Sequence, residues 1–445
     1  MNVVYPSNVL HHVGGKGYNL YVGEYIQYHQ KRERSMSYRS RFVIIILLVY
    51  ILTTFVTPAQ AGVPVVGRSA VLIDSKSGQI LYTKNENQRL PPASTTKILT
   101  AIIALEQRKL IDEVVSGTNP GLVEPSAIGL KEGEKMVMEN LLYSILLKSA
   151  NDAAVAIAEE ISGSVPEFAA LMNKKARELG CTGSNFANPN GLPDPNHYST
   201  AHDLAIIARY AMEKPEFRNF VSTKVKTIPR ADDSDIKWLQ NHNKLLWQYD
   251  GANGIKTGYT REAKQCLVAS AEKDGREFIA VILGSEGNNI WSDAKGLLDY
   301  GFANFSTLRH KTAGTQVKTV EVAKGVSEVD LVTEKDYYYT VAKGKDLNVS
   351  ESIVVNNNIS APVKKGQVLG RVKFMASNRE IGSVNLVAQN DVPVKNYPLK
   401  KAASSTNTLL VGALMITVFV VWNVRKRRRK ARRRSRLWIN RDLIK

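Results

Sequence analysis

The sequence is poor in cysteine and histidine, which limits the kinds of site it can form. The 445 residues include only two cysteines, Cys181 and Cys266, and seven histidines. Two cysteines form at most one disulfide in an oxidising compartment, and two buried free thiols fit the sequence at least as well. The histidines are scattered and no His-Glu-x-x-His motif occurs, which disfavours a metallopeptidase. The Gly-x-Ser-x-Gly elbow of esterases is also missing.

The centre of the chain has little excess charge, although the formal net charge of the whole is +19. Residues 1–41 carry +4 and residues 425–445 carry +11, which leaves +4 for everything between them. Nucleic-acid-binding domains carry their basic residues on a folded surface. The charge distribution therefore argues against a nucleic-acid partner and assigns the basic excess to the two ends.

The N-terminal region has the pattern of a secretory signal peptide. Phe42–Val56 is mostly apolar, follows a basic flank, and precedes Ala59-Gln60-Ala61, which places small residues before a cleavage site. We expect residues 1–61 to be an N-terminal extension and signal peptide, cleaved after Ala61. Signal peptides seldom begin this far into a chain, and Met36 heads one of ordinary proportions. An uncleaved membrane helix is the alternative.

The C-terminal region lacks charge over a long stretch and then becomes strongly basic. Residues 402–424 carry no charge, and Leu409–Val424 is nearly all apolar, just enough to span a bilayer. Ten of the twelve residues in Arg425–Arg436 are Lys or Arg, and such a cluster beside a membrane span stays in the cytoplasm. An amphipathic interfacial helix would need a polar face, which this segment lacks.

These features predict a single-pass protein of the cell membrane with an extracytoplasmic body. We expect a linker at residues 398–408, a transmembrane helix at residues 409–424 and a basic cytoplasmic tail at residues 425–445.

Two domains are expected in the body. Residues 62–310 have strand patterns near both ends and helical patterns between them. This order predicts an α+β domain, an antiparallel sheet flanked by helices, in which both ends of the segment contribute strands. In residues 315–397 short alternating runs are separated by Gly, Asn and Pro, which predicts a small all-β domain.

Several elements of the first domain have clear boundaries. Ser164 and Thr200 are each placed to cap the N-terminus of a helix, and Gly180 follows the last turn of the first of these. Lys273-Asp274-Gly275 predicts a hairpin turn. The run around Ile98–Leu105 is apolar almost all round, which predicts a buried helix.

Ser94-Thr-Thr-Lys97 opens this buried helix and is the first candidate for a catalytic motif. The spacing puts a hydroxyl and an amine on one helix face, one turn apart. Serine needs an adjacent base to be a nucleophile, and burial lowers the pKa of a lysine enough to make it one. Pro91-Pro92 places Ser94 at a helix N-terminus, where the dipole and the free N–H of Ser94 suit an oxyanion.

The spacing Ser-x-x-Lys alone is a weak signal, because it occurs three more times. The other copies begin at Ser234, Ser270 and Ser292. The first and last lie in polar surroundings that would keep the lysine protonated, and the middle one runs from a strand into a hairpin turn. Only the pair Ser94–Lys97 opens a buried helix.

Two further motifs add to the signal. Ser149-Ala-Asn151 separates two apolar helical segments, as expected at a helix break that faces a cleft; an ordinary helix–helix turn is the alternative. Lys256-Thr-Gly258 leads into Tyr259, and its glycine allows another backbone to approach a strand edge. Lys256 and Thr257 offer hydrogen-bond donors for a carboxylate; a simple turn before a strand is the alternative.

Ser-x-x-Lys, Ser-x-Asn and Lys-Thr-Gly, in this order, are the motifs of penicillin-recognising serine enzymes. The chain resembles the low-molecular-mass penicillin-binding proteins, the D-Ala-D-Ala carboxypeptidases, over about residues 62–400. The supporting stretches are Pro92-Ala-Ser-Thr-Thr-Lys97, Asn188-Pro-Asn-Gly-Leu192 and His197-Tyr-Ser-Thr200. The resemblance implies a fold like that of penicillin-binding proteins and β-lactamases, and neither cofactor nor metal.

The resemblance also implies an activity and a role for each site residue. Peptidoglycan stem peptides ending in D-Ala-D-Ala would be the substrates, and β-lactam antibiotics the inhibitors. Ser94 would be the nucleophile and Lys97 its base, with Ser149 and Asn151 completing the catalytic group. Lys256, Thr257, Gly258 and Tyr259 would bind the substrate, with the N–H groups of Ser94 and Tyr259 forming the oxyanion hole.

The sequence departs from the family pattern at two places. Ala263-Lys264 replaces the usual Ala-Gly, and His242 stands where relatives often place an arginine. A class A β-lactamase is disfavoured by the lack of a Glu-x-x-Leu-Asn segment and by the extra β domain. A non-catalytic wall-binding relative stays open as an alternative, with Lys264 as its best support.

Overall fold

The computed structural model describes residues 63–117, 126–230, 232, 235–395 and 406–439. The predicted signal peptide at residues 1–61, most of the predicted linker at residues 398–408 and the end of the basic tail lie outside the described residues.

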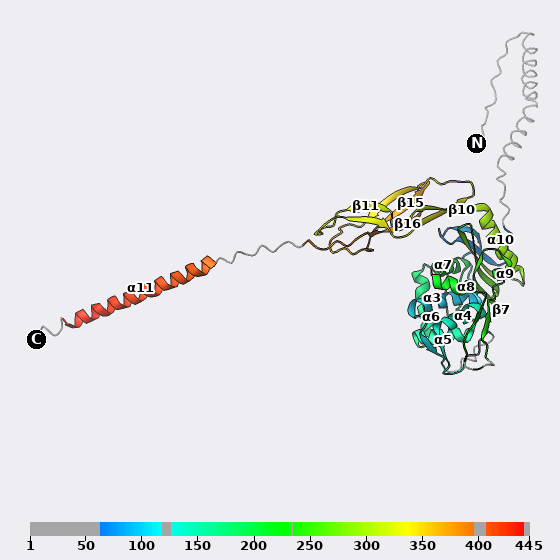
Figure 1. Cartoon of the computed structure of the whole chain (residues 1–445), viewed down its shortest axis with the longest axis horizontal. Helices are drawn as coiled ribbons and strands as arrows, with labels where there is room; N and C mark the ends of the chain where they lie inside the picture. Colours follow the sequence, from blue (N-terminus) through cyan, green and yellow to red (C-terminus); the bar gives the residue numbers. More distant parts are fainter. Residues whose placement is uncertain (1–62, 118–125, 231, 233–234, 396–405, 440–445) are drawn as a thin grey trace, which may run out of the picture.

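A five-stranded antiparallel sheet forms the centre of the first domain (Figure 1). Its strand order is β2-β1-β9-β8-β7, so the first two strands of the domain join its last three, as the sequence predicts. The strands are β1 (Ser69–Asp74), β2 (Ile80–Lys84), β7 (Ala252–Thr260), β8 (Lys264–Lys273) and β9 (Arg276–Ser285). β7 is an edge strand, so the free edge of the sheet along β7 is available to form a site.

Helices cover both faces of this sheet. Alternate residues of β9 divide between two apolar cores: Ile279 and Val281 face the main helical layer, whereas Ala280 and Ile282 face α10 (Asn289–Asn304). The helical layer comprises α3 (Lys97–Gln107), α4 (Met138–Tyr143), η3 (Ser144–Lys148), α5 (Asn151–Ser162), α6 (Val165–Glu178), α7 (Ala201–Met212) and α8 (Pro215–Ser222). Four short strands and one short helix complete the domain: β3 (Glu113–Val115), β4 (Lys135–Val137), β5 (Val225–Thr227), β6 (Trp238–Gln240) and α9 (Leu245–Gln248).

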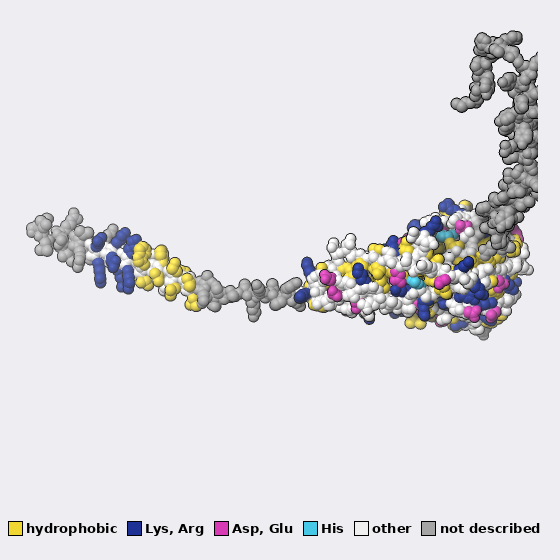
Figure 2. Space-filling model, turned by 90° about the horizontal axis from the view of Figure 1, so that it is seen from above, with side chains coloured by type: hydrophobic (Ala, Val, Ile, Leu, Met, Phe, Trp, Pro, Cys, Tyr) yellow, Lys and Arg dark blue, Asp and Glu magenta, His cyan; other side chains and the backbone are white. Residues whose placement is uncertain are grey.

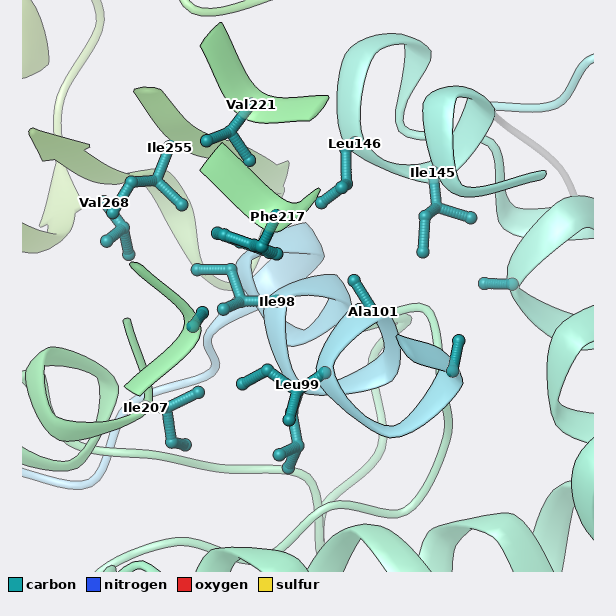
Figure 3. Packing of buried hydrophobic residues seen from close by; sticks show 14 of the residues in the cluster. Ile98, Leu99, Ala101, Ile145, Leu146, Ile207, Phe217, Val221, Ile255 and Val268 are labelled. Atoms are coloured by element: carbon teal, nitrogen blue, oxygen red, sulfur yellow. The ribbon is translucent and has the colours of Figure 1, made fainter. Parts of the chain in front are cut away.

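Helix α3 runs through the middle of the main core. Every residue from Lys97 to Ala104 is buried, so the prediction that this almost wholly apolar helix is buried is confirmed. Figure 3 shows Ile98 next to Phe217, with the strand residues Ile255 and Val268 close by in the same cluster. Burial of this kind is worth about 1.5–3 kcal/mol for each large apolar side chain. The helix that begins at the catalytic candidate Lys97 is therefore held rigidly.

The predicted caps and turn are confirmed. Ser164 Oγ accepts a hydrogen bond from the N–H of Glu167, and Thr200 Oγ1 accepts one from the N–H of Asp203. Gly180 follows α6 with φ = +86°, and Asp274 and Gly275 have positive φ in the hairpin between β8 and β9. Cys181 and Cys266 are both free and buried, so they do not form the disulfide that the sequence left open.

The second domain is all-β, as predicted. Its five-stranded sheet has the order β11-β12-β16-β15-β14, and a separate pair joins β10 to β13. Its core gathers residues such as Leu331, Phe374 and Leu386. The strands are β10 (Phe305–Lys311), β11 (Gln316–Val320), β12 (Val329–Thr333), β13 (Tyr337–Ala342), β14 (Ser350–Val355), β15 (Val368–Ala376) and β16 (Arg379–Ala388).

Helix α11 (Thr406–Ile439) contains the predicted apolar segment and the start of the basic tail. Figure 2 shows apolar side chains on one part of this helix and Lys and Arg side chains on the next. The apolar side chains from Leu410 to Val424 are exposed. A helix at residues 409–424 is therefore confirmed, but within the described residues no helix is both long and apolar enough to cross a membrane.

Candidate active site

Ser94 lies in a tight 3₁₀ turn, η1 (Ala93–Thr96), that leads directly into α3. Ala93 has φ = +48°, a left-handed conformation that is unfavourable for a residue with a Cβ. The hydroxyl of Thr95 donates a hydrogen bond of 2.7 Å to the carbonyl of Pro92 and closes the turn. The turn thus places Ser94 one residue after a strained position and one turn before Lys97.

Lys97 Nζ is 3.0 Å from Ser94 Oγ, so the first motif forms the contact that its spacing predicts. The amine also donates to Asn151 Oδ1 at 2.7 Å and to the carbonyl of Asn190 at 2.6 Å. Lys97 is fully buried. Burial, together with the positive charge of Lys256, holds the pKa of Lys97 well below its usual range, although Asp152 acts in the opposite direction.

The second motif occupies the predicted helix break. Ser149 has φ = +65° and ends η3, and Asn151 is the first residue of α5. The N–H of Asn151 donates to the carbonyl of Ser126 at 2.6 Å. The break brings the two side chains to Lys97 and Lys256, so the alternative of an ordinary helix–helix turn does not describe this segment.

The third motif lies within the edge strand β7, not in a turn before it. Lys256 Nζ donates to Ser149 Oγ at 3.1 Å and to the carbonyl of Thr257 at 2.9 Å. Burial lowers the pKa of Lys256 to about 7. A Cβ on Gly258 would lie 2.8 Å from the backbone nitrogen of Ser94, so the glycine allows β7 to approach η1 as the sequence predicts.

The three motifs meet at one cleft, with a volume of about 340 Å³. Ser94, Ser149, Thr257, Gly258 and Tyr259 line it. Lys97, Asn151 and Lys256 are buried behind this lining and connect to it by the hydrogen bonds given above. The other lining residues are Ser126, His242, Lys244, Gln265, Cys266, Leu267, Gly287, Asn288, Ile290 and Trp291. All eight predicted site residues therefore come together.

Some residues of the site carry no recognisable signal in the sequence. Asp152 is buried, and its carboxylate accepts from the N–H groups of Ile128 and Leu130. Cys266 and Trp291 line the cleft from β8 and α10. Asn190 did have a signal, because it lies in the family-like stretch at residues 188–192.

The two departures from the family pattern have different surroundings. Lys264 begins β8 with φ = +59°, and its amine lies 3.8 Å from a carboxylate oxygen of Glu286. It does not line the cleft. His242 does line the cleft, and the pKa of its imidazole is lowered by partial burial and by the positive charges of Lys256 and Lys148. A neutral imidazole cannot replace the permanent charge of an arginine.

The other serine–lysine pairs lack this arrangement where the structure describes them. Ser270 lies in β8, and its hydroxyl donates to Asn253 at 2.6 Å. Ser292 is exposed on α10 and donates to the carbonyl of Asn289. Ser234 lies outside the described residues.

Comparison with protein families gives two matches. Residues 56–287 match the Peptidase_S11 family, described as D-alanyl-D-alanine carboxypeptidase. Residues 305–394 match the C-terminal domain of penicillin-binding protein 5. The two matches cover the two domains in turn.

Individual known proteins and a solved structure agree with these family matches. The chain is 38% identical to the D-alanyl-D-alanine carboxypeptidase DacF of Bacillus subtilis, over 73% of this chain and 85% of that protein. It is 36% identical to DacA of Haemophilus influenzae, over 76% and 87%. The crystal structure of penicillin-binding protein 5 from Haemophilus influenzae superposes with a TM-score of 0.60 and 34% identity, covering 76% of this chain and 99% of that one.

Proposed function

Because the chain belongs to the D-alanyl-D-alanine carboxypeptidase family, we propose that Ser94 is the nucleophile that attacks the bond between two terminal D-alanines. The protein is a penicillin-binding serine carboxypeptidase that acts on peptidoglycan. The observation that supports Ser94 is its 3.0 Å contact with the buried amine of Lys97. A serine at a helix N-terminus with such a base beside it is an activated nucleophile.

Lys97 acts as the base. A neutral amine has two protons and one lone pair. Its two N–H groups donate hydrogen bonds to the side-chain oxygen of Asn151 and to the backbone carbonyl of Asn190, and the lone pair then faces Ser94 Oγ. The lowered pKa of Lys97 supports the neutral form before reaction.

Ser149 carries the proton to the leaving amine, and Asn151 orients Lys97. Ser149 Oγ accepts a hydrogen bond from Lys256 and lines the same cleft as Ser94, which supports this role. The carbon–nitrogen bond breaks, the acyl group stays on Ser94 Oγ, and D-alanine leaves. Water then hydrolyses the ester. A β-lactam follows the first half of this sequence and leaves Ser94 acylated.

Lys256 and Thr257 bind the terminal carboxylate. In its protonated form, Lys256 is a buried cation beside a cleft, where charge attraction is stronger than in water. The N–H groups of Ser94 and Tyr259 form the oxyanion hole. The close approach of β7 to η1, where Gly258 lies against the backbone nitrogen of Ser94, supports this pairing.

Residues 409–424 of α11 hold the protein in the cell membrane, with the body outside and the tail at residues 425–445 inside. The exposed apolar side chains and the basic run that follows them support this arrangement. Residues 402–405 of the uncharged stretch lie outside the described part of the chain.

A chain that ends at Lys395 should move to the soluble fraction and still bind penicillin. A truncated chain that stays with the membranes would contradict this role of α11.

Labelling with a fluorescent penicillin tests the assignment of the nucleophile. The native protein should form a stable covalent adduct, and Ser94→Ala should form none. Ser292→Ala is a matched control, since it alters an exposed serine of another Ser-x-x-Lys copy and should label normally. Labelling of Ser94→Ala would contradict the assignment, and rapid release of the label by the native protein would indicate a β-lactamase. Release of D-alanine from a stem pentapeptide checks the reaction itself.

A further inference from the structure

Arg230 is a buried arginine that does not line the catalytic cleft. Its guanidinium donates to both carboxylate oxygens of Glu134, at 2.6 and 3.0 Å. It also donates to the backbone carbonyl of Ile128 at 2.8 Å and to that of Gly129 at 2.9 Å. Arg230 therefore binds two consecutive carbonyl groups of a segment, residues 126–130, that has no regular secondary structure.

Residues 126–130 also contact the catalytic group. Ser126 lines the cleft, and its carbonyl accepts a hydrogen bond of 2.6 Å from the N–H of Asn151. The side chain of Asn151 in turn accepts from Lys97 Nζ at 2.7 Å. The segment is therefore one hydrogen bond away from a residue that orients the proposed base.

Asp152 makes a second connection between this segment and α5. Its carboxylate accepts from the N–H of Ile128 at 3.1 Å and from the N–H of Leu130 at 3.0 Å. Among the residues that the structure describes, the backbone hydrogen bonds of residues 126–130 go to Asn151, Asp152 and Arg230 alone. Without Arg230, the start of α5 would be the only one of these partners left to fix the segment.

We propose that Arg230 is a positioning residue for the acylation of Ser94, because it fixes residues 126–130 and so keeps Asn151 and Asp152 in place beside Lys97. The inference rests on the proposed function, in which Lys97 is the base. Arg230 does not touch the reacting atoms. Its loss should therefore slow the chemical step and leave the binding of penicillin unchanged.

Acylation of the full-length protein in detergent tests this role. A series of fluorescent penicillin concentrations separates the rate constant at saturation from the concentration that gives half of it. Arg230→Lys keeps the positive charge and loses the planar group that binds several acceptors at once. We expect the saturating rate constant to fall about tenfold, as a small misplacement near the reacting atoms predicts, and the half-saturating concentration to stay the same.

Arg276→Lys is the matched control. Arg276 Nη1 also donates to two backbone carbonyls, those of Phe302 at 3.0 Å and Phe305 at 2.9 Å. None of these three residues lines the cleft. Arg276→Lys should therefore be acylated at the native rate, even if both variants unfold at a lower urea concentration than the native protein.

A double-mutant cycle tests the route through Asp152. Asp152→Asn keeps the shape of the side chain but replaces one acceptor oxygen with an amide that donates. If Arg230 acts through the segment that Asp152 binds, the two substitutions are coupled. On the pH-independent plateau of acylation, Arg230→Lys should then lower the rate by a smaller factor in the Asp152→Asn background than in the native protein.

Three results would overturn the inference: a native saturating rate in Arg230→Lys, an equal loss in Arg276→Lys, or the same factor in both backgrounds of the cycle. If circular dichroism shows that Arg230→Lys does not fold, Glu134→Gln takes its place, because it weakens the hold on the same guanidinium. That variant should also be acylated more slowly at saturation, and a native rate would overturn the inference. Absence of any label on the native protein is a different result, because it would contradict the proposed function itself.

Discussion

The carbonyl oxygen of Ala93 packs against Gly191 so closely that a Cβ on Gly191 would lie 1.9 Å from it. Both residues have left-handed backbones, with φ = +48° for Ala93 and φ = +86° for Gly191. Ala93 immediately precedes Ser94, and the neighbouring Asn190 accepts a hydrogen bond from Lys97. The loop at Gly191 therefore holds both the nucleophile and its base in position.

Replacement of Gly191 by alanine should disrupt this support. The new methyl group cannot fit unless Ala93 moves, and a displacement of about 1 Å near the reacting atoms lowers rates about 100-fold. We expect Gly191→Ala to lower the rate of acylation by penicillin at least that much while circular dichroism shows an intact fold. Gly180→Ala is the control, because Gly180 has the same φ of +86° but no atom within 4 Å of its Cβ position. Equal acylation rates in the two variants would contradict the prediction.

Replacement of Lys264 by glycine should stabilise the first domain. A left-handed conformation costs a residue with a Cβ roughly 1–2 kcal/mol, and glycine avoids this cost. The greater freedom of glycine in the unfolded chain offsets part of the resulting gain in stability. The exposed pair of Lys264 with Glu286 contributes little. We expect the free energy of unfolding in urea to rise by about 1 kcal/mol. Lys264→Ala removes the same charge and keeps the strain, so a similar gain in that variant would exclude backbone strain as the cause.

The charge of Lys256 should limit activity at high pH. Its pKa in the free enzyme is about 7, so the proton needed to attract a carboxylate is lost as the pH rises through this value. The profile of kcat/KM reports groups of the free enzyme, and we expect it to fall above about pH 7 for a substrate with a terminal carboxylate. A substrate with a terminal carboxamide should lack this falling limb. The same decline with both substrates would remove Lys256 from carboxylate binding.

The charge of Asp152 should shift the acid limb of the pH profile of penicillin acylation. Asp152 raises the pKa of Lys97, against the effects of burial and of Lys256. Removing this negative charge favours the neutral amine, so Asp152→Asn should move the rising limb of penicillin acylation to lower pH. Glu160→Gln is the control on the same helix, because that carboxylate faces Arg108 at 3.2 Å on the surface. An unshifted limb in Asp152→Asn would contradict the assignment of Lys97 as the base.

The sequence predicted those parts of the fold and site that depend on local chemistry. Ser94 and Lys97 are three residues apart at the start of a helix, and the helical turn brings them together. The caps at Ser164 and Thr200 follow from side chains that satisfy free N–H groups of their own helices. The order of strands and helices was enough to predict a sheet built from both ends of the domain.

The remaining features depend on contacts between distant segments, which the sequence does not display. Nothing near Asp152 indicates that its carboxylate accepts hydrogen bonds from residues 128 and 130. Cys266 and Trp291 line the cleft only because β8 and α10 pack beside β7. The left-handed backbone of Ala93 follows from its neighbours at Gly191 and Gly258, since alanine alone would avoid it.

The position of β1 in the central sheet also affects how the domain is made. β1 lies between β2 and β9, and Val71 on β1 is paired with Val281 on β9, more than 200 residues later in the chain. Contacts of this kind form late and slowly, because a very long loop must close first. During synthesis the sheet therefore stays incomplete until residue 285 has emerged. If the chain is exported through a channel before it folds, as the proposed location requires, such a delay is an advantage, because β1 can pair only with its neighbour β2 until β9 has passed.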